Sequence, residues 1–301
     1  DGLAQVVQQA AEATDLYVRA QLMGERGGQP GGLDAVAELV LAVGEAEAEL
    51  AERLHDLRVE ARDLRVHDGL PPGALPGRRS LDPAATKRDA TWRTALTRIL
   101  DCVDPALLPQ AAQQARSGLQ AAKAERLEAL ADRFLGGDVA AADAAQTVFV
   151  AAALQVTWTR MAALLDPKDL GSGNAVSGDC PACGSPALCG VVTPGGTKFG
   201  HRHLHCSLCA TSWRYVRAKC VHCGSTEKVS FRQLSGTSFV RAECCESCKG
   251  YSKVFYVEKV KPVEPMADDL ASLGLDVLIG EEGYARAPNP FVLGIMERPE
   301  G

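Results

Sequence analysis

The chain has 301 residues, a formal net charge of -6, 46% hydrophobic residues and 23% charged residues. This length can bury the cores of two ordinary domains, and the composition excludes a disordered or collagen-like protein. The apolar run from Ala144 to Thr159 contains two Gln and three Thr, so it is too short and too polar to span a bilayer. No membrane segment is expected. The first 25 residues lack a basic start followed by an apolar block, so no export signal is expected in them.

The N-terminal half carries helical periodicity. Apolar residues recur at intervals of three and four among Ala, Leu and Glu, which favour helix. Helices are expected over residues 3–23, 33–66, 84–100, 105–135 (with room for a break) and 138–165. Residues 67–83 are rich in Pro and Gly and should form an exposed loop. Asp138 follows two glycines and is the expected N-cap of the last helix.

That last helix is expected at the centre of a bundle. Its apolar residues nearly encircle it: Val148, Val150, Leu154, Trp158 and Met161. We therefore expect Trp158 in the core rather than in a functional site. Residues 166–179 look like a linker.

Beyond the linker the period changes to two. Short stretches rich in aromatic and β-branched residues predict antiparallel hairpins at residues 186–192, 197–206, 212–220, 228–234, 237–243 and 251–258. Helical pattern returns at residues 266–279, and residues 284–294 should be extended.

Cysteine is concentrated in this second half, where ten of the eleven cysteines lie between Cys180 and Cys248. Eight of them form four Cys-x-x-Cys pairs: Cys180 with Cys183, Cys206 with Cys209, Cys220 with Cys223, and Cys245 with Cys248. Two thiolates at this spacing on a tight turn can bind one ion, and two such turns complete a tetrahedral tetrathiolate site.

Three arrangements of the four pairs into two sites are conceivable. Compared with sequential sites, nested sites cost only about 0.25 kcal/mol more in loop-closure entropy and crossed sites about 0.9 kcal/mol more, so this entropy does not select one arrangement. Internal repetition favours the sequential arrangement, because CPACGS (180–185) and CVHCGS (220–225) share their Cys, Gly and Ser positions. The sequence therefore predicts one hairpin module carried twice, with sequential sites. Gly184 and Gly224 then occupy the position after a turn where a positive φ is often needed.

These patterns predict an α+β protein. An N-terminal α-helical bundle domain precedes two tandem β metal modules of the rubredoxin-like or zinc-ribbon-like kind. The expected divisions are 1–172 for the helical domain, 173–215 and 216–262 for the two modules, and 263–301 for a C-terminal helix and extended tail.

The predicted ligands fit more than one metal. Tetrahedral sulfur suits zinc or a mononuclear iron, and the spacing lacks the usual runs that bind iron-sulfur clusters. Cys189 and Cys244 are left over; Cys189 should be a buried thiol, while Cys244 could exchange with its neighbour Cys245. His201, His203 and His205 alternate on one strand face, and His222 lies inside a Cys-x-x-Cys turn. All four are expected to be exposed or locally hydrogen-bonded.

Charge differs between the two halves. From Cys180 to Lys261 there are 12 Lys plus Arg and 4 Asp plus Glu, which gives +8, and two divalent tetrathiolate sites would reduce this to about +4. The aromatic residues interleaved with these cations are Trp213, Tyr215, Phe231, Phe239 and Tyr251. Such a surface could meet nucleic acid or an acidic protein, or could simply be solvated.

The chain resembles FdhE-type formate dehydrogenase accessory proteins. The resemblance is carried by CPACGS (180–185), HLHCSLCATSWRYVRAKCVHCG (203–224), AECCESCKGYSKVF (242–255) and DDLASLGLDVLIGEEGYARAPNPFVL (268–293), with AAALQVTWTRMAALL (151–165) also similar. The extra Cys189 and Cys244 and the N-terminal region depart from it.

The resemblance implies a cytoplasmic maturation factor that is not an enzyme. Its partner would be the catalytic subunit of a molybdenum- or tungsten-dependent formate dehydrogenase, and its two four-cysteine sites would hold iron, with zinc left open by the spacing. The sequence shows no Ser-His-Asp arrangement and no phosphate-binding G-x-x-x-x-G-K loop. Two alternatives remain at this stage: nucleic-acid binding by zinc ribbons, which is favoured less, and thiol-disulfide exchange by an exposed Cys-x-x-Cys. Whether the chain forms a homodimer stays open.

Overall fold

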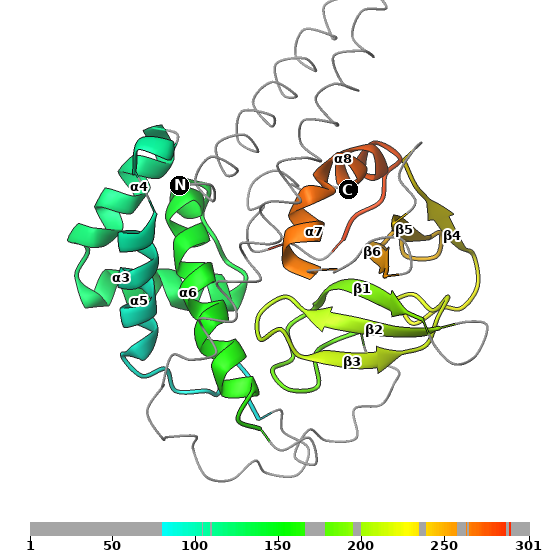
Figure 1. Ribbon diagram of the computed structural model, residues 1–301, viewed down its shortest axis with the longest axis horizontal. Coiled ribbons are helices and arrows are strands. Elements are labelled where there is room, and N and C mark those ends of the chain that lie inside the picture. The colour runs from blue at the N-terminus through cyan, green and yellow to red at the C-terminus, as the bar shows by residue number, and fades with distance from the viewer. Residues whose placement is uncertain are drawn as a thin grey trace, which may run out of the picture.

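The computed structural model describes residues 80–103, 105–108, 110–165, 178–194, 200–234, 239–257, 263, 265–286 and 289. The predicted helices over 3–23 and 33–66, and most of the predicted loop, linker and extended tail, lie outside these residues. The described part consists of a helical domain beside a sheet that carries two further helices (Figure 1). None of the described helices combines the length and the apolar character needed to cross a membrane.

The helical domain is built around one central helix. Its helices are α3 (Thr91–Cys102), α4 (Gln110–Ala121), α5 (Ala124–Gly136) and α6 (Ala144–Ala162), with 3-10 turns η1 (Pro105–Leu107) and η2 (Ala141–Asp143). α6 packs against the other three, as its nearly complete apolar circumference predicts. Trp158 is fully buried, and its Nε1 donates to the Leu81 carbonyl at 3.0 Å, which confirms it as a core residue.

The predicted start of α6 at Asp138 is wrong. Gly137 ends α5 in the left-handed region with φ 74°, and the Asp138 amide donates to the Arg133 carbonyl at 2.9 Å. Asp138 therefore closes the preceding helix instead of opening the next one. α6 begins six residues later, after Asp143, whose carboxylate accepts hydrogen bonds from Arg126 and Arg133 of α5.

Two other helix boundaries also differ from the prediction. The first described helix starts at Thr91 rather than at residue 84, because the Asp89 side chain accepts the Thr91 amide at 2.8 Å and so holds a turn before the helix. The long helix predicted over 105–135 is broken between Ala121 and Ala124 into α4 and α5.

A six-stranded sheet forms the second half. Its strands are β1 (Ala187–Thr193), β2 (His201–Cys206), β3 (Ser212–Tyr215), β4 (Val229–Arg232), β5 (Val240–Cys245) and β6 (Tyr251–Tyr256), in the spatial order β3-β2-β1-β6-β5-β4. Each predicted strand stretch overlaps one of them, although β1 and β5 run one and two residues past the predicted ends, and β3 ends at Tyr215, after which the chain continues as a connector.

The sheet joins two copies of one unit. β1, β2 and β3 form an antiparallel meander, β4, β5 and β6 form a second one, and the two meet where β1 pairs with β6 in parallel. The copies also share register, since Ala187 lies opposite Cys206 in the first and Val229 lies opposite Cys245 in the second. The repeat seen in the sequence is thus a translation along one continuous sheet. The division of the chain at residues 172, 215 and 262 stays a prediction.

Two hydrophobic cores hold these parts together. One lies in the helical domain and includes side chains from the first two Cys-x-x-Cys turns. The other lies under one face of the sheet, where α7 (Pro265–Ala271) and α8 (Leu273–Glu281) pack on strand residues such as Val191 and Phe255. The helix predicted over 266–279 is therefore present, interrupted at Ser272.

A buried ion cluster lies between β6 and these two helices. Lys253 has no exposed surface, and its Nζ lies 3.1 Å from Asp269 Oδ1 and 2.7 Å from Asp276 Oδ2. Arg286 binds both carboxylate oxygens of Asp269, at 2.5 and 2.6 Å. Burial acts to raise the pKa of Asp269, but Lys253 and Arg286 outweigh it and hold that pKa below its usual range. The two cations and two carboxylates balance in charge, which burial requires.

Removing one member of this balanced set should be costly. We expect Lys253→Met to lower the free energy of unfolding by about 3–5 kcal/mol, because it leaves an uncompensated buried carboxylate. The matched control is Lys249→Met, which removes an exposed lysine paired with Glu246 and should cost less than about 1 kcal/mol. Chemical denaturation measures both. Equal losses in the two variants would contradict the assignment of the ion cluster as a core element.

Candidate metal centres

The four Cys-x-x-Cys pairs adopt the same turn. In each turn the amide of the first cysteine donates to the carbonyl five residues later, at 2.8–2.9 Å: Cys180 to Ser185, Cys206 to Thr211, Cys220 to Ser225 and Cys245 to Gly250. Amides inside the turn point at sulfur, as when the Leu208 amide donates to Cys206 Sγ at 3.3 Å and the His222 amide to Cys220 Sγ at 3.4 Å. Such donors stabilise a thiolate.

The residue after each second cysteine has a positive φ. Gly184 has φ 87° and Gly224 has φ 73°, as the sequence predicted for these two glycines. The other two turns place Ala210 (φ 55°) and Lys249 (φ 54°) there. This left-handed conformation costs a residue with a Cβ about 1–2 kcal/mol relative to its relaxed state, so the surrounding turn must hold it in place.

The eight sulfurs gather in two groups of four. Cys180, Cys183, Cys206 and Cys209 form the first cluster, and Cys220, Cys223, Cys245 and Cys248 form the second; within each cluster the sulfurs lie within 4.8 Å of one another. This is the sequential arrangement of the four pairs. None of these cysteines is in a disulfide.

The separations suit a tetrahedral ion. In the first cluster Cys180 and Cys209 are 3.5 Å apart and Cys183 and Cys206 are 3.4 Å apart. In the second cluster the two cross-turn distances, Cys220 to Cys248 and Cys223 to Cys245, are both 3.7 Å. A tetrahedral ion with metal-sulfur bonds of about 2.3 Å separates its ligands by about 3.8 Å. The donor set and its spacing therefore fit one ion per cluster.

Without an ion, the four thiols of the first cluster differ in pKa. Hydrogen bonds from Cys183, Cys206 and Cys209 hold the pKa of Cys180 far below its ordinary value. Hydrogen bonding with Cys180 raises the pKa of Cys206 and of Cys209 in return. Hydrogen bonding with Cys180 acts to raise the pKa of Cys183, but hydrogen bonds with Cys206 and Cys209 outweigh it and lower that pKa. Two of the four thiols are therefore held in favour of the thiolate and two against it, a difference that a bound cation would remove.

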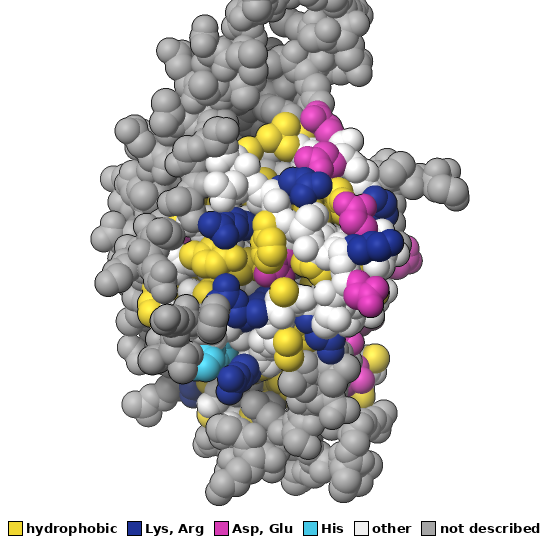
Figure 2. Space-filling model, turned by 90° about the vertical axis from the view of Figure 1, so that its right-hand side faces the viewer, with side chains coloured by type: hydrophobic (Ala, Val, Ile, Leu, Met, Phe, Trp, Pro, Cys, Tyr) yellow, Lys and Arg dark blue, Asp and Glu magenta, His cyan; other side chains and the backbone are white. Residues whose placement is uncertain are grey.

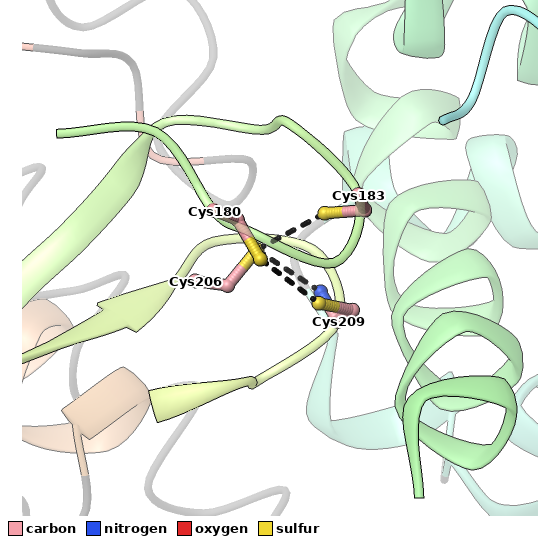
Figure 3. A group of neighbouring side chains, drawn as sticks. All are labelled: Cys180, Cys183, Cys206 and Cys209. Carbon is pink, nitrogen blue, oxygen red and sulfur yellow. Dashed lines mark hydrogen bonds between the residues drawn. The ribbon is translucent and has the colours of Figure 1, made fainter. Parts of the chain in front are cut away.

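The first cluster is sealed against the helical domain (Figure 3). Its four cysteines are at most 3% exposed. One turn is tied to the helices by the Leu81 amide, which donates to the Ala182 carbonyl at 2.9 Å. The other is tied by Gln155 of α6, whose side-chain amide donates to the Ser207 carbonyl at 2.5 Å. This cluster is therefore part of the joint between the two halves of the described chain.

The second cluster lies at the surface. Cys220 and Cys245 are buried, whereas Cys223 and Cys248 are exposed. His222 packs beside Gly250, where an added Cβ would lie 2.6 Å from its ring, and its Nε2 is 2.9 Å from the Tyr251 carbonyl. The expectation of local hydrogen bonding for His222 is thus confirmed.

A buried ion pair spans the two copies of the sheet unit. Arg202 of β2 lies 2.6 Å from Glu243 of β5, although β1 and β6 run between these strands. The guanidinium crosses β1 over Gly190, where a Cβ would come within 2.9 Å of its Nε. Arg202 also donates to the Lys219 carbonyl of the connector at 3.4 Å. Sequence reasoning missed this pair, because an isolated Arg and an isolated Glu on different strands carry no signal.

The remaining cysteines of the second half stay outside both clusters. Cys189 is fully buried, and burial raises the pKa of its thiol. Cys244 lies in the core beneath α7 and α8, where burial raises its pKa to about 11, so it points away from the second cluster and does not replace Cys245.

Most of the predicted surface aromatics are not on the surface. Tyr215 and Tyr251 are buried, and Trp213 and Phe239 pack against the two cores. Of the five, only Phe231 is exposed, at 46%. Along β2, His201 is exposed while His203 and His205 are partly buried.

The left-handed turn positions give a paired prediction. Gly184→Ala should lower the free energy of unfolding by about 1 kcal/mol, because alanine is strained at that φ. The reverse change, Ala210→Gly, releases the same strain and should leave stability unchanged or raise it by up to about 1 kcal/mol. Thermal unfolding of the metal-loaded chain measures both. A loss of similar size in both variants would show that φ at these positions does not govern the turns.

Comparison with known proteins gives one family. Models of three FdhE regions match this chain: the N-terminal region over residues 33–174, the central domain over 179–217 and the C-terminal domain over 218–293. The chain is 37% identical over 233 residues to a Protein FdhE homolog of Haemophilus influenzae (strain PittGG), covering 76% of each chain.

A second relative and a solved structure agree. The chain is 38% identical over 265 residues to a Protein FdhE homolog of Pectobacterium atrosepticum, covering 84% of this chain and 80% of the relative. Its fold matches the crystal structure of the FdhE protein from Pseudomonas aeruginosa with a TM-score of 0.69 and 28% identity, over 97% of this chain and 96% of that one. The chain belongs to the FdhE family.

Proposed function

We propose that this chain is a formate dehydrogenase accessory protein rather than an enzyme. It acts in the cytoplasm and binds the catalytic subunit of a molybdenum- or tungsten-dependent formate dehydrogenase during assembly. Membership of the FdhE family supports this function. The observation that carries it further is one continuous sheet that combines two four-cysteine clusters with an exposed cationic and apolar face.

The proposal includes two bound ions, one in each cluster. The ligands would be Cys180, Cys183, Cys206 and Cys209 for the first ion, and Cys220, Cys223, Cys245 and Cys248 for the second. Iron is favoured by the family resemblance, and zinc fits the same sulfur geometry. In either case each ion would cross-link the two turns of its own cluster, at the ends of short strands. It carries no reaction step in this proposal.

The proposed contact surface lies on the sheet face opposite α7 and α8. Phe231 on β4 and Val216 in the connector are 46% and 51% exposed. Arg217 and Lys219 lie in the same connector, and Arg241 stacks on Tyr256 with 4.9 Å from its guanidinium carbon to the ring centroid. Figure 2 views the side of the molecule that carries β4, where Lys and Arg lie among hydrophobic side chains, with Asp and Glu side chains toward one edge of this side. Exposed aromatic and Arg side chains of this kind are enriched at protein interfaces.

The charge of this surface favours an acidic partner segment. Arg217, Lys219 and Arg241 contribute cations, while Glu243 is buried against Arg202 and is not available to a partner. We therefore propose an acidic, partly apolar segment of the unfinished catalytic subunit as the occupant.

The two alternatives lose support at specific residues. Stacking of single-stranded nucleic acid needs several exposed aromatic side chains, and four of the five candidates are buried or packed in a core. Thiol-disulfide exchange needs a free Cys-x-x-Cys, whereas each pair faces a second pair across a cluster. Salt-sensitive binding to single-stranded RNA would revive the first alternative, and a Cys-x-x-Cys pair with both thiols free in the metal-loaded chain would revive the second.

Binding to the catalytic subunit tests the proposed surface. Phe231→Ala should weaken binding by about 1–3 kcal/mol if Phe231 is buried at the contact, because truncating an aromatic anchor removes most of its burial energy. Leu278→Ala is the matched control, since Leu278 is 45% exposed on α8, which covers the other sheet face. Surface plasmon resonance with the purified subunit measures both variants.

Charge reversal gives an independent readout of the same surface. Arg217→Glu should weaken binding and should also reduce its dependence on salt, because it removes a cation that faces an acidic segment. Equal affinities for wild type, Phe231→Ala and Arg217→Glu would reject this surface while leaving the accessory function standing. Failure of the wild-type chain to bind any formate dehydrogenase catalytic subunit would reject the function itself.

A further inference from the structure

The translation that relates the two sheet units makes their metal clusters directly comparable. Each unit contributes one Cys-x-x-Cys turn before its first strand and one after its second strand. The second cysteines of the turns are Cys183 and Cys209 in the first unit and Cys223 and Cys248 in the second. Differences between these matched positions therefore report on the surroundings and not on the fold of the turn.

The matched cysteines differ sharply in exposure. Cys183 and Cys209 are each 1% exposed, and both belong to the core that includes α3 and α6. Cys223 and Cys248 are exposed. In the first unit the helical domain covers the sulfurs of Cys183 and Cys209. In the second unit the sulfurs at the matched positions are open to solvent.

The residues between the cysteines of each turn show the same difference in exposure. Ala182 and Leu208 occupy the third position of the two turns in the first unit, and they are 0% and 4% exposed. Their counterparts in the second unit are His222 and Ser247, which are both exposed. Apolar side chains at these positions fit permanent burial, whereas His and Ser fit a surface in contact with water. The sequence of the second unit is therefore adapted to an open cluster.

The two clusters also differ in how they are tied to the rest of the chain. Hydrogen bonds from Leu81 and Gln155 fix both turns of the first cluster to the helical domain. In the second cluster, Lys219 lies beside Gly224, with 3.6 Å from its Cε to the position of an added Cβ. A long cationic side chain of this kind at a turn can draw an anionic chelator or competing thiolate toward the sulfurs.

We propose that the two clusters hold their ions differently, an inference that rests on the metal occupancy proposed above. The first cluster keeps its ion as a permanent joint between the helical domain and the sheet. The second cluster exchanges its ion with the solution while the chain remains folded, through Cys223 and Cys248. Replacing a tetrathiolate ligand requires an incoming group to reach the ion or a proton to reach a sulfur, and only the second cluster offers that access without opening of the fold.

The test is metal release from the full-length chain loaded with zinc. A chromogenic zinc chelator should remove one equivalent at least about tenfold faster than the other, because release from the sealed cluster requires local opening. Alkylation with N-ethylmaleimide, followed by mass spectrometry of peptides taken during the fast phase, should label Cys223 and Cys248 while Cys183 and Cys209 stay unlabelled. Circular dichroism over the same period should show that the chain stays folded.

Matched variants assign the phases independently. Cys223→Ser should eliminate the fast equivalent and leave the slow phase and most of the thermal stability intact. Cys183→Ser should lower the melting temperature much more, because it disrupts the joint with the helices.

Release of both equivalents with one rate constant, or early labelling of Cys183 and Cys209, would overturn the inference and leave the accessory function standing. A chain that binds no zinc or iron would overturn the proposed metal scaffold itself. The two failures are therefore distinguishable by metal stoichiometry alone.

Discussion

The crowding of four sulfur atoms at the end of each sheet unit is the constraint on which the second half of the molecule depends. The strands are only four to seven residues long, and isolated meanders of this size are marginal in water. Each unit ends in two turns whose sulfurs approach to 3.4–3.7 Å without a covalent bond. Four thiols at these separations are less favourable than four thiolates around a cation, so a bound ion would add to the stability of each unit.

The surroundings turn two similar units into two different parts. The first is enclosed by the helical domain, which reaches it through Trp158, Leu81 and Ala182 in one continuous chain of hydrogen bonds. The second is covered by α7 and α8 on one face only, so two sulfurs of its four-cysteine cluster and its opposite face remain accessible. Arg202 and Glu243 connect the two units across the sheet, in addition to the pairing of β1 with β6.

The sequence predicted the parts of the fold that follow from local pattern. Helical periodicity located α6, alternation located six strands, and repetition of CPACGS as CVHCGS selected the arrangement of the sulfur clusters seen here. Helix ends were less predictable, because Asp138 matches the pattern of an N-cap, and the left-handed Gly137 that makes it close α5 instead is seen only in the structure. The alternating pattern of β6 carries no sign that Lys253 is buried. Its burial depends on Asp269 and Asp276, which a distant segment supplies, and no local pattern reports such a pairing.

Because the two units are related by a translation, the described sheet ends in an unpaired edge strand at β4. β1 and β4 occupy equivalent places in the two units. β1 pairs with β6, whereas no described strand pairs with the outer side of β4. An exposed edge strand is a template to which another extended chain can add by β-pairing, and proteins prevent this with short edge strands and charged side chains. β4 is only four residues long and ends at Arg232, which is held by Glu282 at 3.0 Å. That brevity and that ionic end protect the molecule from open-ended self-association, the hazard inherent in any module that stacks by translation.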